Sequence, residues 1–323
     1  MSKYLIGVDL GGTNTKAAIY SKQFETVTEL SVATEAAKGP AYVLSNIAET
    51  VQKLLASVNL SQEDIEVMGM GIPGLLDPQA GFSIFSPNFP DWENIPVVDR
   101  MKEHFNFPVY IDNDVRVNLY GEWRHGAGAG YQNIFLITLG TGLGSGIVCG
   151  GQVLYGTTSS AGEIGHMNMY REGRPCKCGS SGCLGRYASA VGMVNTLLEK
   201  LAAGQQSMIQ DWVQGDYTHI TAKMISDAYD LEDQTAREVM QETGEILGFG
   251  LANVINLFNP EIVIVGGGMS AAGERLLGTV RETVHRHALK LSREACRIEP
   301  ARLGGRAGMF GAAAYALDRL QHG

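Results

Sequence analysis

The chain has 323 residues, 45% of them hydrophobic and 18% charged, a composition that excludes an intrinsically disordered protein. Lys and Arg number 25 and Asp and Glu number 34, so the formal net charge of −9 argues against general binding to nucleic acids or anionic membranes. At roughly 100–200 residues per domain, the length favours two domains, which need no disulfide bonds to be stable.

The N-terminal segment predicts a strand and not a targeting sequence. Tyr4–Leu10 is short, rich in β-forming residues and contains Asp9, so it fits no signal-peptide core. No run of roughly 18 apolar residues occurs in the chain, and we therefore expect a cytoplasmic protein. The turn Gly11-Gly12-Thr13 and the strand-like Thr15–Tyr20 follow, which together predict a hairpin.

Helices and strands alternate through the next part of the chain. Hydrophobic spacing predicts a helix over Ala41–Val58 and strands over Val67–Ile72 and Val109–Ile111. The last strand ends at Asp112-Asn113-Asp114, and a helix is expected to follow through about Trp123. The first of these strands runs into Pro73-Gly74. The glycine-rich residues 126–130 indicate a boundary or a loop.

The second half of the chain repeats the design of the N-terminus. Ile134–Leu139 and Ser145–Val148 flank the glycine turn 140–144, a weak internal repeat that suggests two similar domain cores. The later elements are helices over Tyr187–Leu201, Thr235–Phe258, about Gly273–Lys290 and Ala307–Leu320, and a strand over Ile262–Val265 followed by three glycines. Strands that alternate with helices indicate an α/β fold.

Three of the five cysteines lie close together, at Cys176, Cys178 and Cys183. With His166 they form a Cys3His set, which is typical of a closed, tetrahedral and therefore structural zinc site. The alternative is three neighbouring cysteines without a metal. The remaining two, Cys149 and Cys296, are isolated and are expected to be buried apolar residues.

The 41 glycines exceed the roughly 23 that average usage would give, and they form no repeat or linker tract. Both glycine turns, 11–13 and 140–144, carry threonine and offer backbone N–H groups that a phosphate can approach closely. Neither turn is a Walker A loop or a dinucleotide-binding fingerprint. The two glycine turns are therefore either a pair of ordinary hairpins or parts of a phosphate-binding cleft.

Asp-x-Gly-Gly-Thr-x-x-Lys at residues 9–16, with Gly-Thr-Gly-x-Gly at 140–144, resembles the actin/hexokinase/Hsp70 superfamily. This resemblance implies two ribonuclease-H-like α/β domains that clamp ATP and Mg²⁺. The nucleotide-binding residues that it implies are Asp9, Gly11, Gly12, Thr13, Lys16, Thr141, Gly142, Gly144, Gly266, Gly267 and Gly268. Among them, Asp9 would lie near Mg²⁺ and the last three glycines on the adenosine side.

Glu163-x-Gly-His166 and the cysteine string Cys-x-Cys-Gly-x-x-Gly-Cys at 176–183 resemble the repressor/ORF/kinase (ROK) family of bacterial sugar kinases. The resemblance covers nearly the whole chain, and the segment 86–92 shares it. It implies one domain of residues 1–118 plus 305–323, a second of residues 119–304 with the zinc loop 166–183, and a homodimer.

A sugar hydroxyl needs a proton acceptor before it can attack a phosphoryl group, and a carboxylate can serve. By the resemblance, Asp114 is the general base for a hexose 6-hydroxyl. The implied sugar-binding residues are Gly74, Asn88, Asn113, Asp114, Glu163 and His166. The alternatives are local: Asp114 as a helix N-cap, a Pro-Gly turn at Gly74 and an Asx-turn at Asn88.

Two positions depart from the family pattern. The glutamate expected after the cysteine string, a ligand of sugar hydroxyls in relatives, is Gly185 here. Arg116 replaces the usual asparagine two residues after the base. Both changes put ordinary glucose specificity in doubt and favour a bulkier, epimeric or substituted sugar, or an inactivated site.

The leading hypothesis is an ATP-dependent hexose kinase with Mg²⁺ and a structural Zn²⁺. A sugar-binding pseudo-kinase is the alternative that Gly185 raises. A sugar-responsive repressor is less favoured, because the first strand begins at Tyr4 and leaves no room for a winged helix, and the chain lacks a basic footprint. We therefore expect a sugar as partner and no nucleic acid.

Overall fold

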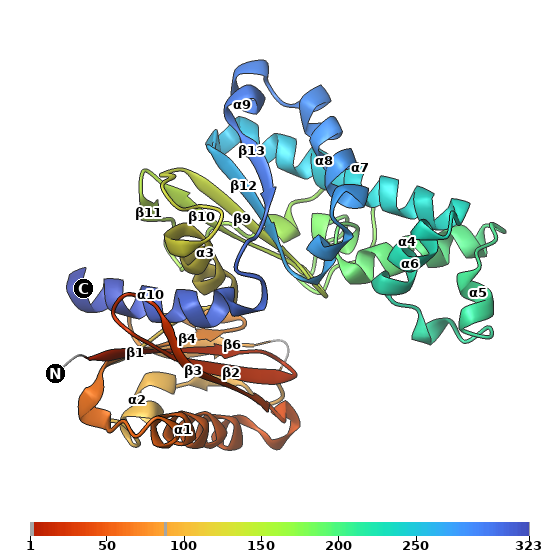
Figure 1. The fold of residues 1–323 in the computed structure, drawn as a ribbon. Coiled ribbons are helices and arrows are strands. Elements are labelled where there is room, and N and C mark those ends of the chain that lie inside the picture. The colour runs from red at the N-terminus through yellow and green to blue at the C-terminus, as the bar shows by residue number, and fades with distance from the viewer. Residues whose placement is uncertain (1–2, 87–88, 323) are drawn as a thin grey trace. The chain divides into compact units, whose positions relative to one another are not determined.

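A computed structural model describes residues 3–86 and 89–322 (Figure 1). The chain divides into two compact units: unit 1 is Met1–Gly130, Tyr155–Ala161 and Arg302–Gly323, and unit 2 is Tyr131–Leu154 and Gly162–Ala301. Each unit combines a mixed sheet with helices, so the predicted α/β class is confirmed. The expected domain boundary after residue 118 falls inside helix α3 (Asp114–His125), which lies whole in unit 1.

The sheet of unit 1 has the order β3-β2-β1-β4-β8. Its strands are β3 (Thr26–Ala33), β2 (Asn14–Tyr20), β1 (Tyr4–Leu10), β4 (Ile65–Ile72) and β8 (Val109–Asn113). β1 and β2 form the predicted hairpin, and β1, β4 and β8 run parallel, so their carboxyl ends meet at one edge. There the register aligns Asp9 with Gly71 and Gly71 with Asp112.

Helices cover both faces of this sheet, with α1 (Pro40–Ser57) on one side and α10 (Ala307–His322) on the other (Figure 1). The predicted helix over Ala41–Val58 is α1, which buries its apolar face against the strands. Unit 1 also contains α2 (Val97–Lys102) and a small sheet of β5 (Leu75–Asp77), β6 (Phe82–Phe85) and β7 (Glu93–Ile95), none of which the sequence predicted.

Glycines let α10 lie directly on the sheet. A Cβ atom on Gly7 or Gly69 would come within 3.0 Å of the backbone oxygen of Met309 or Ala312, and one on Gly311 would strike the backbone of α3. Because these neighbours are backbone atoms, no side-chain rotation can relieve the clash. Part of the glycine excess therefore serves helix packing and not phosphate binding.

Unit 2 repeats the arrangement, with the order β11-β10-β9-β12-β13. The strands are β9 (Ile134–Leu139), β10 (Leu143–Cys149), β11 (Gln152–Val153), β12 (Ile262–Gly266) and β13 (Arg297–Pro300). As in unit 1, an antiparallel glycine hairpin is followed by two parallel pairings, which explains the internal repeat.

The helices of unit 2 bury one continuous core against this sheet. They are α4 (Ala190–Ala202), α5 (Ile209–Trp212), α6 (Ala222–Asp230), α7 (Gln234–Phe258), α8 (Glu274–His287) and α9 (Lys290–Ala295). The predicted end of α7 is confirmed, because Asn259 adopts a left-handed conformation and Pro260 follows. The predicted helix over about Gly273–Lys290 is α8, which ends at His287, and the short helix α9 that follows it was not predicted.

Short 3-10 helices join these elements: η1 (Ala36–Lys38), η2 (Gln62–Asp64), η3 (Ile164–His166), η4 (Leu184–Arg186), η5 (Tyr217–His219), η6 (Gly268–Ala272) and η7 (Gly304–Arg306). Within the described residues, none of the helices has the length and apolar character that crossing a membrane requires.

The contact between Gly69 and α10 generates a stability prediction. Gly69→Ala should lower the free energy of unfolding by about 1–3 kcal/mol or more, because an added methyl must displace backbone. Gly278→Ala is the matched control, since its Cβ would meet only Glu274 Oε2 at 3.9 Å inside helix α8. That variant should be neutral or slightly stabilising. Denaturant unfolding measures both, and equal effects would contradict the packing argument.

Candidate active site

The carboxyl edge of the unit 1 sheet gathers polar groups. Asp9 lies at the end of β1, and the first turn of α10 packs against its carboxylate at Gly308, where a helix N-terminus favours negative charge. Burial raises the pKa of Asp9, and the charge of Lys16 opposes that rise. Lys16 Nζ also donates to the Gly305 carbonyl at 3.2 Å, so the predicted Asp9 and Lys16 lie beside the same end of α10.

The predicted turn at Gly11, Gly12 and Thr13 is a braced hairpin loop. Gly11 N–H donates to the Asn14 carbonyl at 3.0 Å, and Thr34 Oγ1 donates to the Gly11 carbonyl at 2.7 Å. Gly12 is exposed, and a Cβ there would meet nothing within 4 Å. The turn is therefore open to a ligand. The bracing by Thr34 was not predicted.

Asn113 holds the start of α3 and reaches across to Gly74. Its Oδ1 accepts from the N–H groups of Val115 at 2.9 Å and Arg116 at 3.3 Å, so Asn113 is the N-cap that the local alternative assigned to Asp114. Its Nδ2 donates to the Gly74 carbonyl at 3.0 Å. Gly74 has φ +106°, a conformation that favours glycine.

Asp114 is the first residue of α3 and is partly buried. Burial, and then the nearby negative charge of Asp9, raise the pKa of this carboxyl to about 6, although the N–H of Val115 and the charge of Arg116 oppose the rise. At neutral pH the group is therefore mostly ionised but still a better proton acceptor than an exposed aspartate.

A buried ion pair lies next to this carboxylate. Arg116 Nε donates to Asp112 Oδ1 at 2.6 Å, and both side chains are almost fully buried. Tyr155 OH donates to the other oxygen of Asp112 at 2.8 Å. Arg116, the residue that departs from the family pattern, is thus tied to β8, the strand that ends just before the predicted base.

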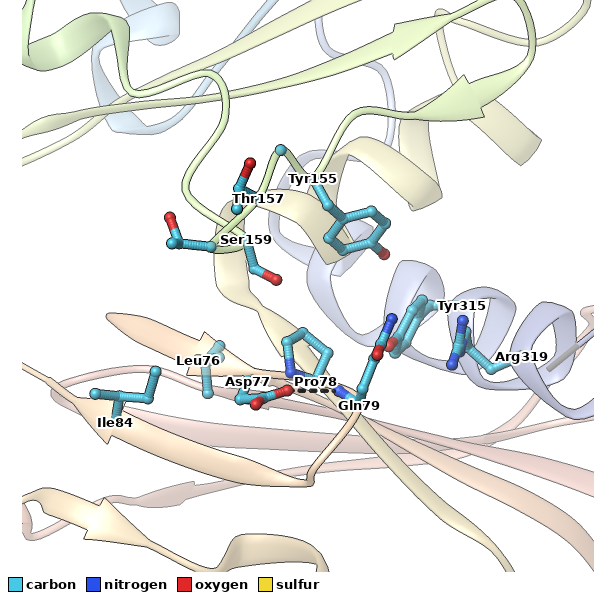
Figure 2. Close-up of a pocket in the computed structure, with 12 residues that line it drawn as sticks. Leu76, Asp77, Pro78, Gln79, Ile84, Tyr155, Thr157, Ser159, Tyr315 and Arg319 are labelled. Atoms are coloured by element: carbon cyan, nitrogen blue, oxygen red, sulfur yellow. Dashed lines mark hydrogen bonds between the residues drawn. The ribbon is translucent and has the colours of Figure 1, made fainter.

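A cavity of about 450 Å³ in unit 1 lies beside Tyr155 (Figure 2). The β5–β6 hairpin, the segment 155–159 and α10 contribute its lining, and Figure 2 shows Tyr315 and Arg319 on α10 at one end. None of the described residues predicted to bind substrate lines it.

In unit 2 the glycine turn 140–144 borders a second cavity, of about 480 Å³. Among the predicted residues, Thr141 and Gly268 line it, together with Gly140. Gly142 is exposed. Gly144 of β10 pairs with Thr138 of β9, and Gly266 and Gly267 precede η6. The remaining lining residues were not predicted from the sequence. They come from α4, α6 and its N-cap, α7, η6 and α8: Ala190, Met193, Thr221, Ala222, Lys223, Ser226, Asp227, Met240, Met269, Ala271, Ala272 and Arg275.

Glu163 immediately precedes the short helix η3 and His166 is its last residue, and both are exposed. The ligand atoms of His166, Cys176, Cys178 and Cys183 all lie within 4.8 Å of one another. Cys178 Sγ and Cys183 Sγ are 3.7 Å apart, as are Cys176 Sγ and His166 Nδ1. A tetrahedral zinc with Zn–S bonds of about 2.3 Å would separate its sulfurs by about 3.8 Å, so the four residues fit that ion.

The pKa values of two of these thiols are shifted in opposite directions. Burial raises the pKa of Cys183 to about 12, whereas the Ser180 backbone N–H lowers that of Cys178 to about 7. A buried thiol such as Cys183 becomes a thiolate at neutral pH only beside a positive charge such as a metal ion. Nδ1 is the ring nitrogen of His166 that faces the cysteines.

Arg174 anchors this loop and was not predicted. Its Nε and Nη2 donate to the two carboxylate oxygens of Glu199 at 2.7 and 2.6 Å, and its guanidinium lies over the Tyr187 ring. Of the remaining predicted residues, Asn88 lies outside the described residues.

The comparison with known families covers both glycine hairpins, Asp9, Asp114 and the Cys3His loop. The model of the ROK family matches residues 5–319. The chain belongs to the ROK family. A glucokinase from Halalkalibacterium halodurans is 36% identical over 96% of this chain and 93% of its own length.

Solved structures of ROK proteins share the fold. A ROK family glucokinase from Streptomyces griseus, in complex with glucose and AMPPNP, superimposes with a TM-score of 0.83 at 32% identity, over 98% of this chain and 99% of that one. The two-domain, actin-like fold predicted from the sequence is thereby confirmed. The family match and the similarity to these glucokinases show that the chain is a sugar kinase of the ROK family.

Regulators occur among its relatives as well. A xylose repressor from Caldicellulosiruptor bescii is 28% identical over 98% of this chain, which spans 78% of the repressor's length. The similarity to that protein is lower than to the glucokinases.

The cysteine loop generates a metal prediction. Purified protein should contain about one zinc per chain, and a chelator should lower its stability, because a structural zinc contributes folding free energy directly. Cys178→Ser should lose most of the metal, whereas Cys149→Ser, an exposed cysteine of unit 2 outside the cluster, should keep it. Elemental analysis decides this, and less than about half a zinc per chain in folded, active protein would contradict the assignment.

Proposed function

We propose that this ROK kinase transfers the γ-phosphoryl group of ATP to the 6-hydroxyl of a hexose, with Asp114 as general base. The observation that carries the proposal is Asp114 itself, a partly buried carboxyl with a pKa near 6 at the N-terminus of α3. The glucokinase relatives, one of them bound to glucose and AMPPNP, support the substrate pair.

On this proposal the residues of unit 1 handle the sugar hydroxyl and the charge of the phosphates. Asp114 accepts the proton as the hydroxyl attacks. Asn113 Nδ2 uses one N–H for the Gly74 carbonyl, which leaves its second N–H for a sugar hydroxyl. The open turn at Gly12, with Lys16 nearby, supplies donors for phosphate oxygens, and Asp9 would hold Mg²⁺, whose charge offsets that of the phosphates.

The residues of unit 2 would bind the nucleotide and the other end of the sugar. The 480 Å³ cavity beside Thr141 and Gly268 is large enough for an adenosine moiety and is lined partly by methionine and alanine side chains. Glu163 and the Nε2 of His166 would contact hydroxyls near the anomeric carbon. The cysteines, with zinc, would hold His166 in that orientation.

We further propose that the enzyme acts in the cytoplasm as a homodimer. Three leucines near the end of α7 and the start of α9 are largely exposed, with Leu257 76%, Leu289 65% and Leu291 84% accessible. Apolar side chains exposed together are typical of protein interfaces.

The role of Asp114 generates a paired prediction of activity and stability. Asp114→Asn should lower kcat by about 10²–10⁴, because the general base is lost. In the parent enzyme, kcat should fall as the pH drops through about 6, since the protonated carboxyl accepts no proton. The same raised pKa means that ionised Asp114 costs stability, a cost that develops as the pH rises through about 6.

Asp114→Asn should therefore be at least as stable as the parent at pH 7 and above, despite its inactivity. Asp99→Asn, which changes an exposed acid of α2 paired with Lys102, serves as control and should retain full activity. Coupled ADP-release assays and thermal unfolding measure the two effects. Near-normal turnover of Asp114→Asn, with sugar binding intact, would overturn the assignment.

Gly185 generates a prediction of specificity. A Cβ at this position would lie 3.2 Å from the Gly165 carbonyl, beside Glu163 and His166, so a glutamate would project next to the proposed sugar contacts after a small local shift. Gly185→Glu should lower the KM for glucose by about tenfold, because it adds a charged hydrogen-bond acceptor for ring hydroxyls. Gly185→Ala, which adds bulk alone, is the control.

The assay is ADP release over a panel of hexoses, N-acetylhexosamines and polyols, with the parent and both variants. The parent should phosphorylate at least one hexose. Sugar binding without turnover on any member of the panel would instead indicate a pseudo-kinase or a regulator. Equal KM changes in Gly185→Glu and Gly185→Ala would contradict a role for the missing acid.

A further inference from the structure

Arg116 is a charged side chain that the fold has buried, with only 5% of its surface accessible. A buried guanidinium is costly unless its N–H groups find partners. Its Nε donates to Asp112 Oδ1 at 2.6 Å, and the Asn113 backbone N–H donates to the same oxygen at 2.7 Å. The other Asp112 oxygen accepts from Tyr155 OH at 2.8 Å, so both oxygens of the carboxylate are occupied.

The second half of the guanidinium reaches a distant part of the chain. Arg116 Nη1 donates to the Ser159 backbone carbonyl at 2.7 Å, 43 residues away in sequence. The guanidinium also lies 5.1 Å from the centre of the Tyr155 ring. One arginine thus joins the end of β8, the first turn of α3 and the segment 155–161.

That segment has no helix or strand of its own. It belongs to unit 1, whereas the residues before and after it, up to Leu154 and from Gly162, belong to unit 2. The backbone of Gly156 and Ser159 adopts positive φ, of +70° and +55°. Figure 2 shows Tyr155 and Ser159 on this segment, above the β5–β6 hairpin. Its attachment to α3 therefore depends on side chains, chiefly Arg116 and Tyr155.

The segment leads directly into proposed sugar contacts. Glu163 follows its last residue, Ala161, by two positions, and His166 by five. A displacement at Ser159 therefore shifts the chain from which Glu163 extends. An asparagine, which the family resemblance leads one to expect at position 116, would be too short to make both bonds of the arginine.

We propose that Arg116 is a positioning residue for sugar binding, which fixes the segment 155–161 to the start of α3 and so sets the place of Glu163. This inference rests on the proposed function, because Glu163 is a sugar contact only if that proposal holds. The residues proposed for the nucleotide, at 140–144 and 266–268, take no part in the network around Arg116. The attachment should therefore affect the sugar and not ATP.

Arg116→Lys is the first test variant. Lysine keeps the positive charge beside Asp112, but a single ammonium group lacks the planar fork that spans Asp112 and the Ser159 carbonyl. The KM for the sugar should rise on the order of tenfold, as for loss of one charged hydrogen bond. The KM for ATP should stay within about twofold. Hydrogen exchange of peptides covering 155–161 should become faster.

Two further variants make the test specific. Tyr155→Phe removes only the hydroxyl bonded to Asp112 and should produce the same pattern at smaller size, which keeps the proposal testable if Arg116→Lys does not fold. Arg124→Lys is the matched control on the same helix, where an exposed arginine pairs with Asp318 at 3.2 Å. It should leave both KM values and the exchange of 155–161 unchanged.

The outcomes separate this inference from the proposed function. A parent enzyme that phosphorylates no sugar would overturn the proposed function, while the exchange measurement would still decide whether Arg116 holds the segment. Unchanged exchange of 155–161 in Arg116→Lys would overturn the attachment. Two results in an active Arg116→Lys enzyme with faster exchange would overturn the positioning role. One is an unchanged KM for the sugar, and the other is a KM for the sugar and a KM for ATP that rise together.

Discussion

The contact on which unit 1 depends is the approach of helix α10 to the strands beneath it, backbone against backbone. Gly7 on β1 and Gly69 on β4 leave the space that Met309 and Ala312 fill, and Gly311 does the same against α3. At Gly7 and Gly69 no side chain separates the helix from the strands, so α10 lies close to the sheet at these positions. The helix N-terminus then meets the Asp9 carboxylate at Gly308, at the same sheet edge as the start of α3.

Helix α3 carries two buried charges on this framework, and each binds a segment near a point where the chain passes between the units. Glu122 accepts from the N–H groups of Ala127 at 2.8 Å, Arg302 at 3.1 Å and Leu303 at 2.7 Å, and Arg116 binds Ser159. The helix that begins at Asp114 therefore also holds the crossing segments of unit 1. Since buried charges tolerate few geometries, this arrangement couples the position of the proposed base to the path of the chain.

Local signals in the sequence predicted much of this protein. Both glycine hairpins, the alternation of β1, β4 and β8 with helices, and the Cys3His cluster depend on short patterns of residue type, and the structure and the family comparison bear out the fold that they imply. Contacts between distant segments carried no such signal. The packing of Gly69 on Ala312, the bond from Arg116 to Ser159 and the methionines that line the unit 2 cavity join residues far apart in sequence. For the same reason, the sequence linked the glycine excess to turns and gave no sign of its role in helix packing. The sequence showed that Arg116, in the first turn of α3, departs from the family pattern, but it did not show that the Ser159 carbonyl would be its partner.

The central claim is that the phosphoryl group of ATP is transferred to the 6-hydroxyl of a hexose. The most direct measurement is a ³¹P–¹H correlation NMR spectrum of the product formed by the parent enzyme from ATP, Mg²⁺ and a hexose that it accepts. The account predicts a phosphate monoester whose phosphorus couples to the two protons on carbon 6, formed in a one-to-one ratio with ADP. Coupling to the anomeric proton, or inorganic phosphate as the only phosphorus product besides ADP, would contradict it.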